Sequence, residues 1–157
     1  MAKLQDLLSS VSREILTTSQ AVEGAVFRMH LGEEEGVKGK NAGEAGRNKY
    51  FVVLGHDSEG NAIGFVLIDT CVNPHLPEKR RNAHYKILAK DNAFLNGMDR
   101  YVDCSDFKQI SKSRFSELFG KDKAKGCINP SDLLEIKKMT VEYEDASPKI
   151  LKRFGLK

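Results

Sequence analysis

Two apolar runs in the first half of the chain constrain the fold most strongly. Residues 50–54 and 63–68 are rich in β-branched and aromatic side chains, and the segment between them, Gly55-His56-Asp57-Ser58-Glu59-Gly60-Asn61, has the composition of a turn. Such side chains pack well on a pleated surface, so two runs joined in this way predict an antiparallel hairpin. Because the runs are almost continuously hydrophobic, we expect both faces of the hairpin to be buried.

Three further strands are predicted around this hairpin. Residues 25–31 alternate between two faces, as a half-buried strand does, and shorter apolar runs occupy 84–88 and 100–104. The apolar face of the first strand carries Phe27, Met29 and Leu31. No helical pattern separates the central strands, which argues against a doubly wound parallel sheet. The pattern favours a mainly β, α+β protein built on a small, partly open antiparallel barrel.

Helices are predicted toward the two ends of the chain. Apolar residues recur at spacings of three and four across residues 2–20, which is typical of an amphipathic helix. Asn129-Pro130 and Ser147-Pro148 each place a capping side chain before a proline at the first helical position. We therefore expect a single domain over 1–157. It comprises an N-terminal helical extension (1–22), a barrel with its helix (24–143) and a C-terminal helical tail (144–157).

Two segments are interpreted as loops. Residues 32–48 contain five glycines, three consecutive glutamates and several cations, with little to bury, so we expect a long mobile loop. A second loop runs through Asn73-Pro74 and Leu76-Pro77 into a cluster of basic residues. Loops of the first kind are often functional, because they carry side chains that no core requires.

Composition excludes several classes of protein. The three cysteines are an odd number without a CxxC pair or a histidine at metal-ligand spacing, which argues against a disulfide framework and a zinc site. We expect no cofactor. No window approaches the roughly 18 apolar residues of a membrane span, and the N-terminus lacks a continuous apolar signal core. A cytoplasmic location is therefore expected.

The positive charge of the chain is concentrated locally. The net charge is only +3, too small by itself to indicate a nucleic-acid-binding protein. Two stretches are nevertheless basic, and each cation in them can neutralise one phosphate. The candidate RNA-binding residues are Lys38, Lys40, Lys79, Arg80, Arg81 and His84. We expect a nucleic acid to lie across the 32–48 loop, the end of the 63–68 strand and the segment 79–84.

The order of segments resembles the MazF/PemK family of toxin endoribonucleases. The resemblance covers about residues 24–143. It begins with the glycine-led strand Gly24-Ala25-Val26-Phe27, passes a flexible glycine-containing loop, and enters a strand through Arg47-Asn48-Lys49-Tyr50-Phe51-Val52-Val53-Leu54. A third strand resembles Val66-Leu67-Ile68-Asp69-Thr70, and the closing block is Phe107-Lys108-Gln109-Ile110-Ser111-Lys112-Ser113-Arg114-Phe115. The usual arginine-proline pair is replaced by Lys49-Tyr50, and the hydroxyl position falls on Asp69 or Thr70.

The resemblance implies a fold, an activity and partners. The expected fold is an SH3-like barrel that forms a homodimer, and the expected partners are RNA and a cognate antitoxin protein. The expected reaction is metal-free cleavage of single-stranded RNA by the ribose 2′-hydroxyl, which requires a base, an acid and a cation. Arg47 or Lys49 would supply the cation, Thr70 would hydrogen-bond the phosphate, and Asp69 or a histidine would accept the proton.

Two other interpretations stay open at this point. The departures at Lys49 and Asp69 are compatible with a non-catalytic barrel that binds nucleic acid or a protein partner. The amphipathic N-terminal segment is compatible with an accessory protein that docks on a partner through this helix.

Overall fold

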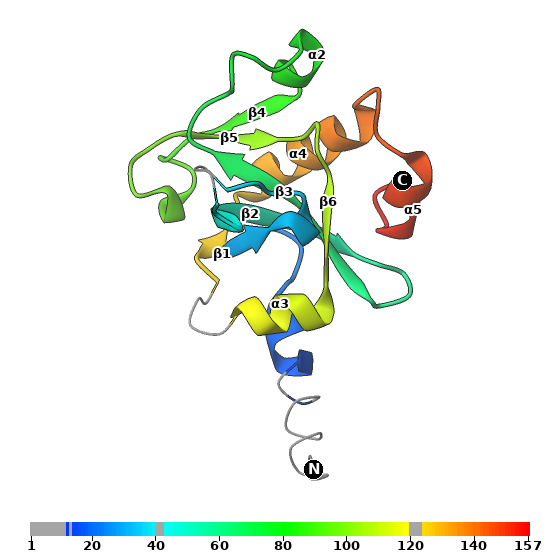
Figure 1. The fold of residues 1–157 in the computed structure, drawn as a ribbon. Helices are drawn as coiled ribbons and strands as arrows, with labels where there is room; N and C mark the ends of the chain where they lie inside the picture. Colours follow the sequence, from blue (N-terminus) through cyan, green and yellow to red (C-terminus); the bar gives the residue numbers. More distant parts are fainter. Residues whose placement is uncertain (1–11, 13, 40–42, 120–123) are drawn as a thin grey trace.

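The computed structural model describes residues 12, 14–39, 43–119 and 124–157 (Figure 1). Its strands are β1 (Ala25–Gly32), β2 (Gly46–His56), β3 (Ala62–Asp69), β4 (His84–Ile87), β5 (Arg100–Asp103), β6 (Lys108–Ser111) and β7 (Gly126–Cys127). Its helices are α2 (Glu78–Arg81), α3 (Lys112–Phe119), α4 (Pro130–Glu142) and α5 (Pro148–Arg153), and two 3₁₀ turns are η1 (Glu33–Glu35) and η2 (Ala93–Leu95). This is an α+β fold dominated by strands, which confirms the predicted class.

The strands form one antiparallel sheet that forks at β3. The strand order is β4-β5-β3-β2-β1-β7, and β6 also pairs with β3. One edge of β3 pairs with β6 along residues 62–65 and with β5 along residues 68–69. Figure 1 shows β6 running steeply across the direction of β4 and β5. The sheet therefore curls into half a barrel.

The central hairpin is buried on both faces, as its composition predicts. Phe51 and Phe65 belong to a core cluster that includes Phe115 of α3, and their ring centroids lie 4.5 Å apart. Val52 and Val66, on the other face, belong to a second cluster that includes Ile136 of α4. The alternation along the strands thus supplies two cores, one under each helix.

The prediction of an unstructured 32–48 loop is wrong at both of its ends. Residues 33–35 form η1, and β2 already begins at Gly46. The Glu35 side chain is buried because its carboxylate accepts a hydrogen bond from the Gly32 amide (2.9 Å) and lies 3.6 Å from the Arg114 guanidinium. A buried charge is tolerated when it is paired in this way, and sequence spacing cannot reveal a partner so far along the chain.

The basic cluster at 79–81 is also helical, although the sequence suggested a loop. These residues form α2, a single turn between Pro77 and Asn82. Proline fixes the backbone at the start of this turn, and the Asn82 amide donates to the Glu78 carbonyl. The turn presents its side chains in different directions, so the three basic residues do not form one patch.

The predicted capping signals at the C-terminal end are confirmed. The Asn129 side chain accepts from the Ser131 amide (2.9 Å) at the start of α4, and the Ser147 hydroxyl accepts from the Ile150 amide (3.3 Å) at the start of α5. At the other end, residue 12 and residues 14–18 are helical and residues 19–20 form a turn, whereas residues 2–11 and 13 of the predicted 2–20 helix lie outside the described residues. None of the helices in the described part of the chain has the length and apolar content needed to cross a membrane.

The C-terminal helix is anchored to the central hairpin. The Arg153 guanidinium makes a bidentate ion pair with the fully buried Asp57 carboxylate, with N–O distances of 2.9 and 2.6 Å. The hydrogen bond from Arg153 lowers the pKa of Asp57 to about 2. A side chain at Gly64 would collide with the Phe107 ring, so glycine permits this close packing. These contacts fix the C-terminal helix against the turn of the hairpin.

Candidate functional site

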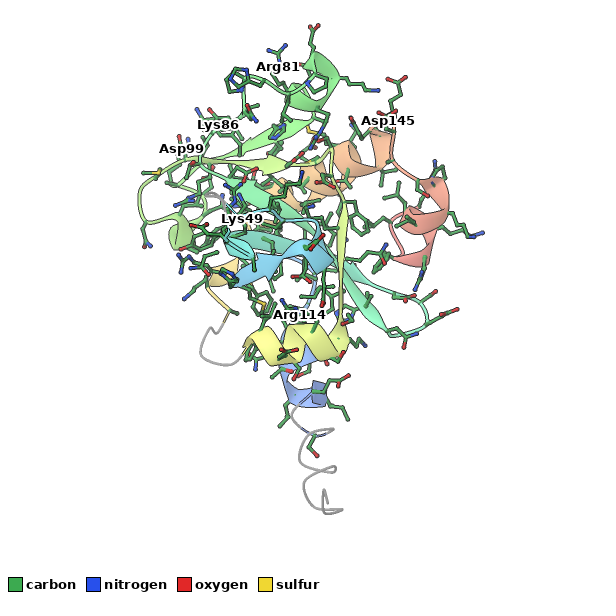
Figure 2. All side chains as sticks on the ribbon, in the orientation of Figure 1. Lys49, Arg81, Lys86, Asp99, Arg114 and Asp145 are labelled. Atoms are coloured by element: carbon green, nitrogen blue, oxygen red, sulfur yellow. The ribbon has the colours of Figure 1, made fainter. Side chains whose placement is uncertain are left out.

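A cavity of about 680 Å³ opens where β2, β3 and β5 meet the loop that follows β3. It is lined by Arg28, Arg47, Asn48, Lys49, Tyr50, Leu67, Ile68, Asp69, Thr70, Cys71, Asn73, Pro74, Leu76, Arg80, His84, Arg100 and Asp103. Lys49 lies centrally on the sheet in Figure 2. Most of the lining is polar or charged, so the cavity is suited to a charged ligand.

Lys49 and Asp69 form an ion pair at the centre of this cavity. The Lys49 ammonium contacts the Asp69 carboxylate, and the two side chains are 11% and 24% exposed. The pairing follows from strand register, because Tyr50 lies opposite Ile68 and residues 49 and 69 come next along the two antiparallel strands. The two charges therefore neutralise each other when no ligand is bound.

His84 and Asp103 form a second pair, on neighbouring strands β4 and β5. They lie directly opposite each other in the ladder, which brings His84 Nε2 to 3.6 Å from Asp103 Oδ1. His84 Nδ1 lies 2.7 Å from the Arg80 carbonyl oxygen. A carbonyl can only accept, so Nδ1 carries the proton that it donates, and the other ring nitrogen, Nε2, faces the Asp103 carboxylate. In the neutral tautomer that carries this proton, Nε2 can accept a proton from a ligand in the cavity.

Hydrogen bonds fix the orientation of Asp103. Its Oδ1 accepts from the Ser105 amide (3.0 Å) and from the Ser105 hydroxyl (2.5 Å). Its Oδ2 lies 3.4 Å from the Arg80 guanidinium, which also donates to the Ser105 hydroxyl. Arg80 thus holds both His84, through its carbonyl, and Asp103, through its side chain.

Two arginines flank an aromatic ring beside these pairs. The guanidinium carbons of Arg28 and Arg100 lie 5.8 and 5.1 Å from the centroid of the Tyr50 ring. Arg28 lies opposite Tyr50 in the β1–β2 ladder, and Arg100 begins β5. The ring attracts both cations through its negative face and holds them at the cavity.

The lining carries an excess of positive charge. Five of its side chains are cationic and two are carboxylates, which gives +3 with His84 neutral. Lys49 and Arg80 are paired with the two carboxylates. Arg28, Arg47 and Arg100 have no carboxylate within ion-pair distance among residues 12, 14–39, 43–119 and 124–157. These three guanidiniums are free to hold an anion, and their planar donors suit phosphate.

Two neighbouring groups cannot act as bases or nucleophiles at neutral pH. Tyr85, next to His84 on β4, donates to the Asp132 carboxylate (2.7 Å), and this bond raises its pKa to about 12. Burial raises the pKa of the Cys104 thiol, next to Asp103, to about 12. Both groups therefore stay protonated at neutral pH.

The structure gathers most of the residues predicted from the sequence. All four candidate catalytic residues line the cavity, together with two of the candidate RNA-binding residues, and these six are Arg47, Lys49, Asp69, Thr70, Arg80 and His84. Lys38 is exposed and does not line it, and Lys40 lies outside the described residues. Lys79 instead pairs with Asp145 (2.6 Å), and the Arg81 side chain donates to the Leu76 carbonyl (3.0 Å).

Four residues of the site were missed by sequence reasoning: Arg28, Tyr50, Arg100 and Asp103. Alternation along the first strand places Arg28 on the face opposite Phe27, which was a usable signal. No pattern in the neighbouring sequence indicated that Arg100 or Asp103 belongs to the site. Their positions there depend on how β5 pairs with β3 and β4.

The potential ligand atoms of Asp69, His84 and Asp103 also lie within 4.8 Å of one another, a spacing that can hold a metal ion.

Comparison with models of protein families finds no match to this chain, and comparison with curated proteins finds none either.

Proposed function

We propose that this chain is a cytoplasmic, toxin-like endoribonuclease of the MazF/PemK type that cleaves single-stranded RNA without a metal. One observation carries the proposal: a single cavity combines three guanidiniums that pair with no carboxylate of the described residues and an imidazole whose Nε2 lies beside two carboxylates. The guanidiniums suit the binding of a phosphate, and the imidazole with its carboxylates suits proton transfer. RNA is the substrate that presents a phosphate beside an ionisable hydroxyl.

The proposed reaction is the cleavage of an RNA phosphodiester by the ribose 2′-hydroxyl next to it. The ribose 2′-oxygen attacks the adjacent phosphorus, the O2′–P bond forms and the P–O5′ bond breaks. The 2′-hydroxyl proton passes to a base, and the departing 5′-oxygen receives a proton from an acid. The products are a 2′,3′-cyclic phosphate end and a 5′-hydroxyl end, so no water or metal is consumed in the step.

His84 is the base that the geometry supports best. The hydrogen bond from Nδ1 to the Arg80 carbonyl leaves Nε2 as the acceptor, and Asp103 lies 3.6 Å from it. A carboxylate in that position stabilises the imidazolium that forms when the proton arrives. Asp69 was the alternative base, but its carboxylate is in contact with the Lys49 ammonium.

Lys49 is the acid and Arg47 the phosphate ligand in this scheme. The ammonium of Lys49 is mostly buried, so its charge acts at low effective dielectric on the phosphate and on the departing oxygen. Arg47 is exposed at the mouth of the cavity, and Thr70 follows β3 at its edge, where its hydroxyl can donate to a phosphate oxygen. The resemblance adds a homodimer and a cognate antitoxin as proposed partners.

Cleavage by purified variants tests the proposal. We expect cleavage of a labelled single-stranded RNA in the presence of EDTA, and a rate about 100-fold or more lower for His84→Gln, since a positioned base contributes about 10² to 10⁴. Lys49→Ala should also lose activity, whereas His75→Gln, which changes an exposed histidine outside the cavity, should not. Thermal unfolding checks that each variant is folded. Equal rates for His84→Gln and the wild type would refute the role of this base.

The second candidate function is a non-catalytic barrel that binds nucleic acid or a protein partner. The Lys49–Asp69 ion pair favours it, because each group neutralises the one that chemistry would use. This candidate predicts RNA binding without any cleavage, and full binding by His84→Gln. The cleavage assay and a binding assay on the same RNA therefore separate the two candidates.

A further inference from the structure

Three potential ligand atoms converge at the inner end of the cavity. One atom each from Asp69, His84 and Asp103 lies within 4.8 Å of the others. Zinc binds nitrogen and carboxylate oxygen at about 2.0–2.2 Å, so the ligands of one tetrahedral ion lie roughly 3.4 Å apart. His84 Nε2 and Asp103 Oδ1 are already 3.6 Å apart. A small movement of the Asp69 side chain would complete a three-ligand set.

The buried histidine gives a second, independent indication of a ligand. Its side chain is 2% exposed, and its Nδ1 proton is donated to the Arg80 carbonyl. Nε2 makes no hydrogen bond within the described residues, and Asp103 Oδ1 lies 3.6 Å from it. A carboxylate oxygen of Asp69 belongs to the same group of three ligand atoms within 4.8 Å. Because Nδ1 is the donor to Arg80, the buried ring directs its other nitrogen, a potential ligand atom, toward a carboxylate that can share a cation with it.

The groups around these ligands orient them in the way that metal sites require. Ligating histidines usually donate their other ring nitrogen to a carbonyl or carboxylate, and ligating carboxylates are themselves hydrogen-bonded. Here the Arg80 carbonyl holds His84, and Ser105 holds Asp103 through its amide and hydroxyl. Asp69 is held by Lys49. The set is thus already positioned by a surrounding shell.

We propose that Asp69, His84 and Asp103 bind a divalent transition-metal ion, such as Zn²⁺ or Co²⁺, in competition with the Lys49 ammonium. The imidazole ligand favours these ions over Mg²⁺ and Ca²⁺, which prefer oxygen alone. The bound ion takes the Nε2 lone pair, so it blocks the proton acceptor of the proposed ribonuclease. The inhibitory consequence rests on the proposed function, whereas metal binding itself does not.

Lys49 provides a direct test of the competition. Its ammonium neutralises Asp69 and lies close to where the ion would sit, so it repels a dication. Replacing Lys49 with alanine removes both effects and should tighten metal binding about tenfold or more. A site that merely collects ions on the surface would not respond to this buried side chain.

The experiment is a titration of the full chain with ZnCl₂, followed by calorimetry, and with CoCl₂, followed by visible absorption. We expect one equivalent of metal, an intense tetrahedral Co²⁺ spectrum, and a loss of affinity of about tenfold or more in Asp69→Asn and in His84→Gln. The exposed residues His75 and Asp145 supply the controls His75→Gln and Asp145→Asn, which should bind as the wild type does. Asp69→Asn alters a side chain that is 24% exposed, so it keeps the test valid if His84→Gln does not fold.

Two results would overturn the proposal. One is the absence of metal binding. The other is a metal affinity that Asp69→Asn does not change and that Lys49→Ala leaves unchanged or weakens. Because the titration contains no RNA, its result does not depend on whether the chain is a ribonuclease. If RNA is cleaved, stoichiometric Zn²⁺ should abolish cleavage and EDTA should restore it. Zn²⁺ that leaves cleavage unchanged at saturation would refute the inhibitory role of the site.

Discussion

The proposed binding of RNA in the cavity predicts a salt dependence set by how many cavity cations are free to contact phosphates. Lys49 and Arg80 are already balanced by Asp69 and Asp103, so they would release few counterions on RNA binding. Arg28, Arg47 and Arg100 have no carboxylate partner within the described part of the chain. Each contact to a single strand contributes about −0.7 to the slope of log Kobs against log salt concentration. Three contacts predict a slope of about −2.

Single substitutions should reduce this slope in equal steps. Arg47→Ala and Arg100→Ala should each bring it to about −1.4, and the double variant to about −0.7, because the contacts are independent phosphate neutralisations. Lys149→Ala is the matched control: it removes one positive charge from an exposed residue of α5, outside the cavity, and should leave the slope near −2.

Fluorescence anisotropy of a labelled 2′-O-methyl oligonucleotide measures the slope without cleavage. The titrations would cover about 50 to 300 mM KCl, where counterion release dominates. A slope near zero, or equal reductions in Lys149→Ala and Arg100→Ala, would refute the placement of the strand in this cavity. A slope steeper than about −3 would show that cations beyond the three arginines contact the backbone.

Three further predictions concern the stability of the fold. Ile136→Ala deletes a fully buried side chain beneath α4 and should lower the free energy of unfolding by about 2–5 kcal/mol in urea titrations. Asn129→Ala removes the N-cap of α4 and should lower the free energy of unfolding by about 1 kcal/mol in the same assay. Asn129→Asp keeps a capping oxygen and should retain most of the stability that the N-cap provides. The pKa of Asp57 is lowered from 3.8 to about 2, so its charge stabilises the folded state above about pH 4 and this contribution is lost as the pH falls through about 2. Asp57→Asn should therefore lower the Tm at pH 5, and its difference from the wild type should shrink between pH 4 and pH 2; a constant difference would contradict the pairing with Arg153.

The parts of the fold predicted from sequence are those that local patterns control. The nearly continuous apolar runs on either side of a turn predicted the central hairpin and its two buried faces, and the Asn-Pro and Ser-Pro pairs predicted the starts of α4 and α5. The misjudged segments depend on distant partners. The buried Glu35 carboxylate, for example, has the Arg114 guanidinium, far along the chain, as its charged partner.

The same division applies to the candidate site. Arg47, Lys49, Asp69 and Thr70 belong to one hairpin, so their proximity follows from its register. Asp103 reaches the cavity because β5 pairs with both β3 and β4, an arrangement that no spacing in the sequence specifies. The charge patterns at 79–81 were read as one patch, yet of these only Arg80 lines the cavity.

The most direct test of the proposed ribonuclease compares two oligonucleotides that differ at one atom. One is a single-stranded RNA that the purified protein cleaves, and the other carries a 2′-deoxyribose at the cleaved position. We predict that only the first is cut, in EDTA, to a 2′,3′-cyclic phosphate and a 5′-hydroxyl, because the 2′-oxygen is the nucleophile. Cleavage of the deoxy substrate, or products with 5′-phosphate ends, would contradict the mechanism built on His84 and Lys49.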